Sequence, residues 1–179
     1  FMDLRLEEEG SEVKIAVDMA NEGLVSQDEA VLRVEAGRLE QLLFPSIDPH
    51  AAVSPVAHGL AASPGAVTGR VAFSADDAEK RAEQGEPVIL VRVETSPEDL
   101  HGMQAAKGIL TARGGATSHA AVVARGMGRS CVVGCHGISI DYETQKMTVR
   151  PDKGEICIVS VGDVITIDGV ERLSGARHR

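Results

Sequence analysis

The sequence predicts an α/β domain with mixed sheets, preceded by a helical lead-in. Three observations support this fold class. Residues 1–55 carry apolar side chains at helical spacing, and residues 46–55 are rich in Pro, Ser and Ala, as a domain boundary is. Beyond the boundary, strand-like and helix-like segments alternate and then give way to several short strands. The 179 residues suffice for one such domain and an appendage.

The lead-in, residues 1–55, is expected to be helical. Apolar residues recur at helical spacing from Val13 to Leu24. The run from Ser26 to Glu29 has the pattern of a capping box, in which each side chain bonds the backbone amide of the other residue. The segment has too few apolar faces to fold well by itself, so we expect it to pack on another part of the protein.

Strands and helices are expected to alternate in the middle of the chain. Val67–Phe73 alternates in polarity, Pro87–Val93 is β-branched and mostly apolar, as a buried strand is, and Ile109–Thr111 is a further short strand. Helices are expected over Ala75–Gln84, after Ser96 with Pro97 in the first turn, and from His119 to about Gly126.

The last part of the chain is expected to form short strands. Beyond Cys131, β-like pieces are separated by turn residues, and Asp152–Gly154 has the composition of a hairpin turn. The candidate strands are Met147–Arg150, Ile156–Val159 and Val164–Ile167.

Composition and charge exclude several classes of function. The chain is 43% hydrophobic but has no Trp, one Tyr and three Phe, so its core is aliphatic and it lacks aromatic platforms for single-stranded nucleic acid. A net charge of −9 argues against nucleic-acid binding, which depends on Lys and Arg. No long apolar run and no signal pattern is present, so we expect no membrane association and a cytoplasmic location.

The three cysteines are expected to be reduced core thiols. Cys131, Cys135 and Cys157 lie in apolar, strand-like surroundings. A Cys-x3-Cys pair without a second pair is a poor zinc pattern. We therefore expect no metal site in this chain.

One segment is free of negative charge. From Leu100 to Ile140 there is not one Asp or Glu, although 27 of the 179 residues are acidic. A carboxylate would repel a phosphate, and a merely buried stretch would exclude arginines as well as carboxylates. The window therefore favours an anion-handling site. Its basic residues and histidines are Lys107, Arg113, Arg125, Arg129, His101, His119 and His136.

A histidine follows a glycine-rich turn inside this window. Gly114 and Gly115 permit a tight turn, and Thr117 or Ser118 can cap a helix that begins near His119. Such a helix start presents free N–H groups and a positive dipole end, which bind anions. Neutral imidazole is a nucleophile near pH 7, so the pattern is typical of a phosphoryl carrier. The alternative is a first-turn histidine that only hydrogen-bonds the loop.

The residues from Thr111 to Arg125 (TARGGATSHAAVVAR) resemble the phosphohistidine signature of phosphoenolpyruvate-utilising phosphotransferases. Within that family, Glu94–Met103, Cys131–Cys135 and Gly162–Gly169 resemble the pyruvate phosphate dikinases, and the lead-in is similar to the connector of those enzymes. The resemblance covers roughly residues 13–169. Residues 170–179 do not resemble the continuation found in the family.

The resemblance implies a swivelling β/β/α sandwich at residues 56–172, preceded by a helical connector at 1–55 and followed by a disordered tail at 173–179. It further implies that an N-terminal nucleotide-binding module, using ATP and Mg²⁺, phosphorylates this domain. A C-terminal barrel then exchanges the phosphoryl group between pyruvate and phosphoenolpyruvate. Both modules are partners within the same enzyme. This domain itself is expected to bind no cofactor and to turn nothing over alone.

The resemblance also assigns roles to residues. His119 would be the covalent nucleophile, through Nε2, and Arg113 its main charge partner, with Arg125 a second candidate counter-charge. Thr117 aligns with a threonine that a regulatory kinase modifies in plant relatives. The residues expected to support the phosphoryl group are Arg113, Gly114, Gly115, Thr117 and Ser118.

Two alternatives remain open from the sequence. The domain could come from a phosphoenolpyruvate synthase or an enzyme I of the sugar phosphotransferase system, although Ser118 and the segment Thr95–Met103 favour a dikinase. It could also be a non-catalytic interaction module of the same fold, which would need neither His119 nor an acid-free surround.

Overall fold

The structure, a computed structural model of the whole chain, describes residues 11–34, 44–47, 55–151 and 154–169. The chain divides into two compact units, residues 1–44 and 45–179. Outside the described residues lie parts of the predicted helical lead-in, the first two residues of the predicted turn at 152–154, and the predicted tail at 173–179.

The described part of the first unit forms α1 (Ser11–Asn21) and α2 (Gln27–Arg33). The predicted capping box begins α2. The Glu29 amide donates to Ser26 Oγ at 3.2 Å, and the Ser26 amide donates to Glu29 Oε2 at 3.0 Å. The bond from the Ser26 amide lowers the pKa of the Glu29 carboxyl. Local sequence therefore suffices to place this helix start.

The second unit is built on two sheets. The larger has the order β1-β5-β4-β3-β2-β9, with β2 to β5 mutually parallel and the outer strands β1 and β9 antiparallel to their neighbours. Its strands are β1 (Leu60–Ser63), β2 (Ala66–Ala72), β3 (Val88–Arg92), β4 (Gly108–Thr111), β5 (Ser130–Val133) and β9 (Val164–Asp168). The smaller, antiparallel sheet contains β6 (Ile138–Asp141), β7 (Lys146–Val149) and β8 (Cys157–Ser160).

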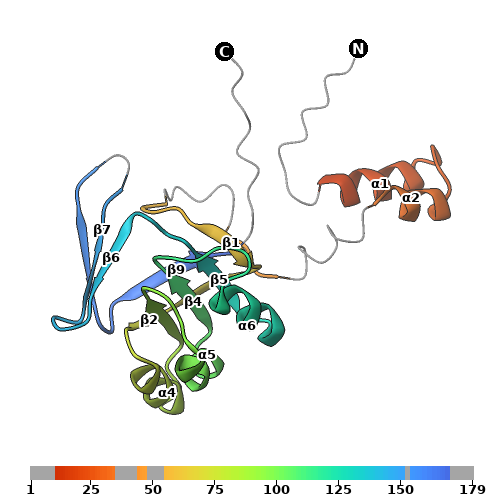
Figure 1. Cartoon of the computed structure of the whole chain (residues 1–179). Coiled ribbons are helices and arrows are strands. Elements are labelled where there is room, and N and C mark those ends of the chain that lie inside the picture. The colour runs from red at the N-terminus through yellow and green to blue at the C-terminus, as the bar shows by residue number, and fades with distance from the viewer. Residues whose placement is uncertain (1–10, 35–43, 48–54, 152–153, 170–179) are drawn as a thin grey trace. The chain divides into compact units, whose positions relative to one another are not determined.

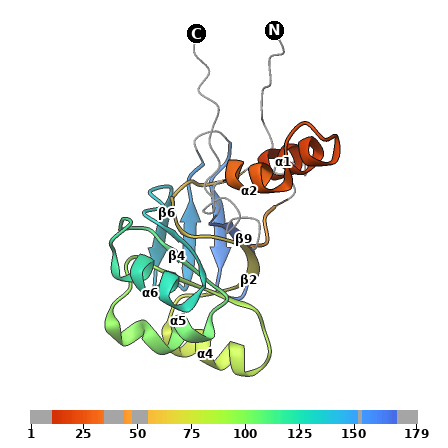
Figure 2. The same ribbon diagram turned by 90° about the vertical axis from the view of Figure 1, so that its right-hand side faces the viewer.

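Helical segments connect the parallel strands. They are α4 (Ala75–Glu83), the 3₁₀ turn η1 (Pro97–Asp99), α5 (Leu100–Ala105) and α6 (His119–Met127). Figures 1 and 2 show α4, α5 and α6 together on one face of the larger sheet. Short β-strand–helix–β-strand connections of one hand place successive helices on the same face in this way.

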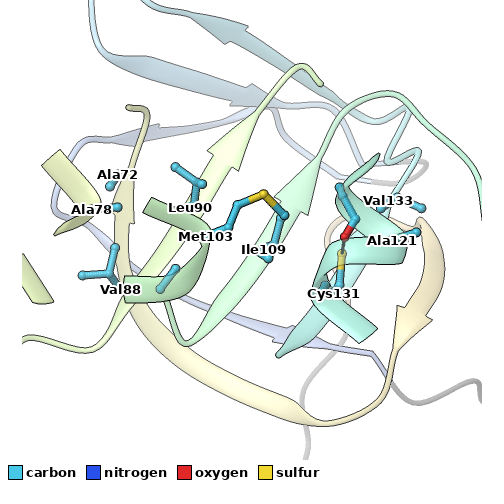
Figure 3. Close-up of a cluster of buried hydrophobic side chains, with 12 residues drawn as sticks. Ala72, Ala78, Val88, Leu90, Met103, Ile109, Ala121, Cys131 and Val133 are labelled. Atoms are coloured by element: carbon cyan, nitrogen blue, oxygen red, sulfur yellow. Dashed lines mark hydrogen bonds between the residues drawn. The ribbon is translucent and has the colours of Figure 1, made fainter. Parts of the chain in front are cut away.

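Successive side chains of the parallel strands point to opposite faces of the large sheet and pack in two separate cores. Leu90 points to the helices, where it lies in a cluster with Met103 and Ala121 (Figure 3). Its neighbour Ile89 points to the other face and packs in a cluster with Met147 of the smaller sheet. The order of layers is thus helices, large sheet, small sheet, which confirms the expected β/β/α sandwich.

Most predicted elements are present, and two details differ. Helix α6 spans His119–Met127, as expected, and the left-handed residue that caps it is Gly128, with φ +62°. The segment after Ser96 begins as a 3₁₀ turn before it becomes α5. Strands β1 and β6 were not predicted, since the two alanines of β1 and the aspartate of β6 are residue types depleted in strands.

The prediction about cysteines was right for two of them. Cys131 and Cys135 are buried free thiols, but Cys157 is exposed on β8, at the edge of the smaller sheet. Burial raises the pKa of the Cys131 thiol to about 12 and also raises the pKa of Cys135. No helix within the described ranges is both long and apolar enough to cross a membrane.

These thiols are expected to differ in reactivity, because the thiolate is the nucleophile and burial suppresses it. Iodoacetamide at pH 8 should alkylate Cys157 in the folded protein and leave Cys131 and Cys135 unmodified, whereas all three should react in urea. Peptide mass spectrometry measures the modification. Alkylation of folded Cys131 as fast as Cys157 would contradict the assigned burial.

Helices α4 and α5 approach so closely that one contact position requires glycine. A Cβ on Gly102 would lie 2.4 Å from Ala75 Cα and 2.8 Å from the Ala75 carbonyl oxygen. Both residues are buried. The backbone of one helix therefore packs directly on the other.

Gly102→Ala is expected to lower the free energy of unfolding by about 1–3 kcal/mol, as overpacking of a filled core does. Gly126→Ala is the matched control, because a Cβ at that helical position meets no atom within 4 Å. Alanine there should instead be neutral or stabilising, by at most about 1 kcal/mol. Urea unfolding compares the two, and equal midpoints for both variants would refute the close-packing argument.

Candidate functional site

The candidate site lies at the carboxyl ends of β3 and β4. These neighbouring parallel strands are in register with Val91 opposite Leu110 and Arg92 opposite Thr111. The loops that follow them therefore leave the sheet side by side, at the edge where α/β sheets commonly bind ligands. The two loops are joined by a hydrogen bond from the Arg113 amide to the Val93 carbonyl, 2.9 Å long.

The loop after β4 is held in a tight turn. The buried Thr111 hydroxyl donates to the Arg113 carbonyl at 2.7 Å. Gly114 has φ +113°, a conformation that favours glycine, and a Cβ there would lie 3.0 Å from Ser118 Oγ. Gly134 faces the turn from the end of β5, where a Cβ would lie 2.6 Å from the Gly114 carbonyl oxygen. The turn thus depends on two glycines, of which the sequence indicated only Gly114.

Helix α6 begins directly after this turn. Ser118 is its N-cap, with Oγ accepting from the Ala121 amide at 3.4 Å and the Ser118 carbonyl accepting from the Val122 amide at 3.0 Å. Within the described residues, the amides of His119 and Ala120 have no acceptor. They stand at the positive end of the helix, which suits an anion.

His119 is the first residue of α6 and is half-buried. Its Nδ1 lies 3.0 Å from Thr95 Oγ1, which comes from the loop after β3. This contact leaves Nε2 without a partner in the described part of the chain. When Thr95 Oγ1 accepts a hydrogen bond from Nδ1–H, the ring lone pair is on Nε2, and that nitrogen is the nucleophile.

Thr95 is a site residue that sequence reasoning did not assign. It is 24 residues from His119 and belongs to a different loop. The signal that could have revealed it is the fold class, because sequential strands of a parallel sheet are usually neighbours and their loops then meet.

The remaining predicted residues fall into different roles. Arg113 and Thr117 are exposed and have no side-chain partner within the described ranges. A Cβ on Gly115 would meet no atom within 4 Å, so space does not require glycine there. Arg125 instead braces the loop, because its Nε donates to the Ala121 carbonyl at 3.0 Å and its Nη2 to the Ala116 carbonyl.

The segment Leu100–Ile140 contains no acidic residue, but the fold brings acidic residues from other segments next to it. Glu94 and Glu98 are exposed on the segment that carries Thr95, next to the loop of His119. His101, inside the window, pairs with Asp76 of α4 at 2.9 Å. The absence of acids along the chain therefore does not extend to the neighbouring elements, which the fold brings in from outside the window.

A shallow hollow borders the loop on the side of Gly114 and Gly134, with a volume of about 370 Å³. It contains neither His119 nor Thr95. Its lining residues are His58, Gly59, Leu60, Gly114, Gly134 and His136. Across the part of the chain that the structure describes, no cluster of three or more His, Cys, Asp or Glu side chains could hold a metal ion.

Comparison with known protein families identifies the family of this domain. Residues 84–172, which include both loops, match the family described as "PEP-utilising enzyme, mobile domain". This part of the chain belongs to that family. The chain is also similar, over most of its length, to proteins several times longer than itself.

The similar proteins carry the name pyruvate, phosphate dikinase. The one from Rhizobium meliloti is 56% identical over 159 residues, which are 89% of this chain and 17% of that protein. The one from Clostridium symbiosum is 50% identical over 159 residues, 88% of this chain and 18% of that protein. A second form from Zea mays is 59% identical over 133 residues, 73% of this chain and 15% of that protein. The chain thus spans less than a fifth of these relatives.

The contact between Thr95 and His119 predicts a change in the imidazole tautomer. Thr95→Val removes the hydroxyl and keeps a branched side chain, so the Nε2–H tautomer, which predominates in free histidine, should gain. Loss of one hydrogen bond of about 1 kcal/mol corresponds to a roughly five-fold change in the tautomer ratio. Ring ¹⁵N chemical shifts measure that ratio. Thr95→Ser, which restores the hydroxyl, is the control, and identical shifts in all three proteins would disprove the contact.

Proposed function

We propose that this chain is the phosphohistidine carrier domain of a pyruvate phosphate dikinase, with His119 as the residue that bears the phosphoryl group. The observation that carries the proposal is the placement of His119. Its Nδ1 is bonded to Thr95 at 3.0 Å, its Nε2 is free of protein partners within the described residues, and it opens helix α6. The 50–59% identity to proteins of that name supports the parent enzyme.

Two in-line transfers follow from this geometry. In the first, the Nε2 lone pair attacks phosphorus, the bond to the donor's leaving oxygen breaks, and that oxygen keeps the electron pair. In the second, an acceptor oxygen attacks phosphorus and the P–N bond returns its electrons to Nε2. The proton on Nδ1 stays on the ring, bonded to Thr95 throughout.

The surroundings can stabilise the bound group. The free amides of His119 and Ala120 and the helix dipole favour negative charge near the ring. The exposed Arg113 guanidinium supplies a full positive charge, with Ser118 and Thr117 hydroxyls as further donors. Gly114 keeps the backbone close, and Gly115 keeps the approach open. The resemblance assigns support of the phosphoryl group to Arg113, Gly114, Gly115, Thr117 and Ser118.

The proposed donor and acceptor sites lie in other modules. A nucleotide-binding module using ATP and Mg²⁺ would charge His119, and a pyruvate-binding barrel would discharge it to form phosphoenolpyruvate. Surfaces that exchange partners in this way must bind weakly. His119 opens a helix at the sheet edge and is half-exposed, as a group that must enter two sites has to be.

Thr117 is proposed as a position at which modification would stop transfer. It is exposed and two residues before His119. A phosphate on its hydroxyl would add a charge of about −1.5 to −2 next to the helix start and would repel an incoming phosphoryl group.

A chimera tests the proposed function. The matching 159 residues of the Rhizobium meliloti enzyme are replaced by this chain's residues, and conversion of ATP, phosphate and pyruvate to phosphoenolpyruvate is assayed. We expect activity in the chimera, and a loss of roughly 10³-fold or more in its His119→Ala variant, because the nucleophile is removed. The phosphorylated peptide should be acid-labile, base-stable and map to His119.

His101→Asn is the matched control for the chimera, since His101 is a half-buried histidine of the same window that pairs with Asp76 instead. Its activity should stay within about two-fold of the parent chimera, as for a surface change. Persistence of the phosphoryl mark in His119→Ala would overturn the assignment. An active His119→Ala chimera would favour a non-catalytic role for the domain.

A further inference from the structure

Tyr142, the single tyrosine of the chain, connects the smaller sheet to the candidate site. It lies in the turn between β6 and β7, and its phenol oxygen accepts a hydrogen bond from the Val93 amide at 2.8 Å. Val93 is the first residue after β3 and is two positions before Thr95. Tyr142, from the turn between two strands of the smaller sheet, thus holds the backbone of the loop that follows β3 of the larger sheet.

The Val93 amide needs an acceptor from outside the large sheet. The neighbouring strand β2 ends at Ala72, whose partner in the ladder is Leu90. Beyond that pair the ladder supplies no carbonyl to Val93, and an unpaired amide is costly. The Val93 carbonyl is already used, since it accepts from the Arg113 amide at 2.9 Å. Val93 is therefore held from both sides.

Arg92 strengthens the same connection. Its guanidinium lies 5.0 Å from the centroid of the Tyr142 ring, a cation–π geometry. Its Nη1 donates to the Phe73 carbonyl at 3.0 Å, and its Nη2 lies 3.3 Å from Asp99 Oδ1. The aromatic ring of Tyr142 and its hydroxyl therefore contact two consecutive residues at the end of β3.

The far end of the loop is fixed by Asp99, whose side chain is buried. Asp99 Oδ2 accepts from the Ser96 amide at 2.9 Å, while Oδ1 pairs with Arg92. Val93 and Ser96 are thus both anchored, and Thr95 lies between them. A loop held at both ends keeps its side chains in one orientation. Because it is already ordered, little conformational entropy is lost when a ligand binds.

We propose that Tyr142 is a positioning residue for phosphoryl transfer. By anchoring Val93 it keeps Thr95 Oγ1 within hydrogen-bonding distance of His119 Nδ1, so that the proton stays on Nδ1 and Nε2 remains the nucleophile. The smaller sheet thereby influences the imidazole of His119 through the Tyr142 hydroxyl. This role rests on the proposed function of His119.

The test uses the full chain with potassium phosphoramidate as a small phosphoryl donor, so no other module is required. The Nε2 lone pair attacks phosphorus, the P–N bond of the donor breaks, and its nitrogen, which carries three hydrogens in the zwitterion, leaves as ammonia with the bonding pair. ³¹P NMR follows phosphohistidine formation at His119. Ring ¹⁵N shifts report the tautomer of the unphosphorylated ring, a readout that a purely structural role would not change.

Tyr142→Phe keeps the ring over Arg92 and removes only the acceptor of the Val93 bond. We expect it to reduce the Nδ1–H tautomer and to slow phosphorylation roughly three-fold, part of the effect of losing one hydrogen bond. In a Thr95→Val background the same substitution should have no further effect, because Tyr142 acts through Thr95. Thr144→Val is the matched control, since it removes a hydroxyl that bonds Asp141 at 2.8 Å in the same turn.

The results that would overturn the role of Tyr142 differ from the result that would overturn the proposed function of His119. Equal slowing by Tyr142→Phe in both backgrounds, no slowing at all, or an equal effect of Thr144→Val overturns the positioning role. Absence of phosphorylation at His119 in the unmodified chain instead overturns the proposed function. If Tyr142→Phe does not fold, incorporation of 3-fluorotyrosine alters position 142 alone and weakens the phenol as an acceptor. A smaller shift in the same direction then supports the role, and unchanged ¹⁵N shifts refute it.

Discussion

The parallel pairing of β3 with β4 is the constraint on which the site depends. It sets Arg92 opposite Thr111, and so the loop of Thr95 and the loop of His119 leave the sheet at the same level. The 3.0 Å contact between Thr95 and His119 follows from that register. A shift of the ladder by one residue would reverse which face each side chain points to and would separate the two loops.

The register is itself fixed by burial on both faces. Leu90 and Ile109 pack under the helices, whereas Ile89 and Leu110 pack against the smaller sheet. Because both faces of the central strands are enclosed, a shifted register would exchange the side chains of the two cores and disrupt their packing. Both cores are mostly aliphatic, and among the described residues Phe73 is the fully buried aromatic side chain.

Charge around the site is arranged by folding as well as by composition. Arg125 belongs to the acid-free window but is used to hold the loop at Ala116, whereas Arg113 extends free from the same loop. Glu94 and Glu98 are exposed on the segment before the window, which also carries Thr95. Among the described residues, the field near His119 therefore combines the α6 dipole, the Arg113 guanidinium and carboxylates on the adjacent loop, rather than a uniformly positive patch.

The sequence by itself determined the features that depend on neighbouring residues. The capping box at Ser26, a cap at Thr117 or Ser118 and the start of α6 near His119 follow from local hydrogen bonds, and the central strands follow from their runs of apolar residues. Only the tertiary structure decided the contacts of Thr95 and Tyr142 with residues 24 and 49 positions away. Such pairs depend on strand order and register, which short-range patterns do not contain, because packing between distant segments selects them.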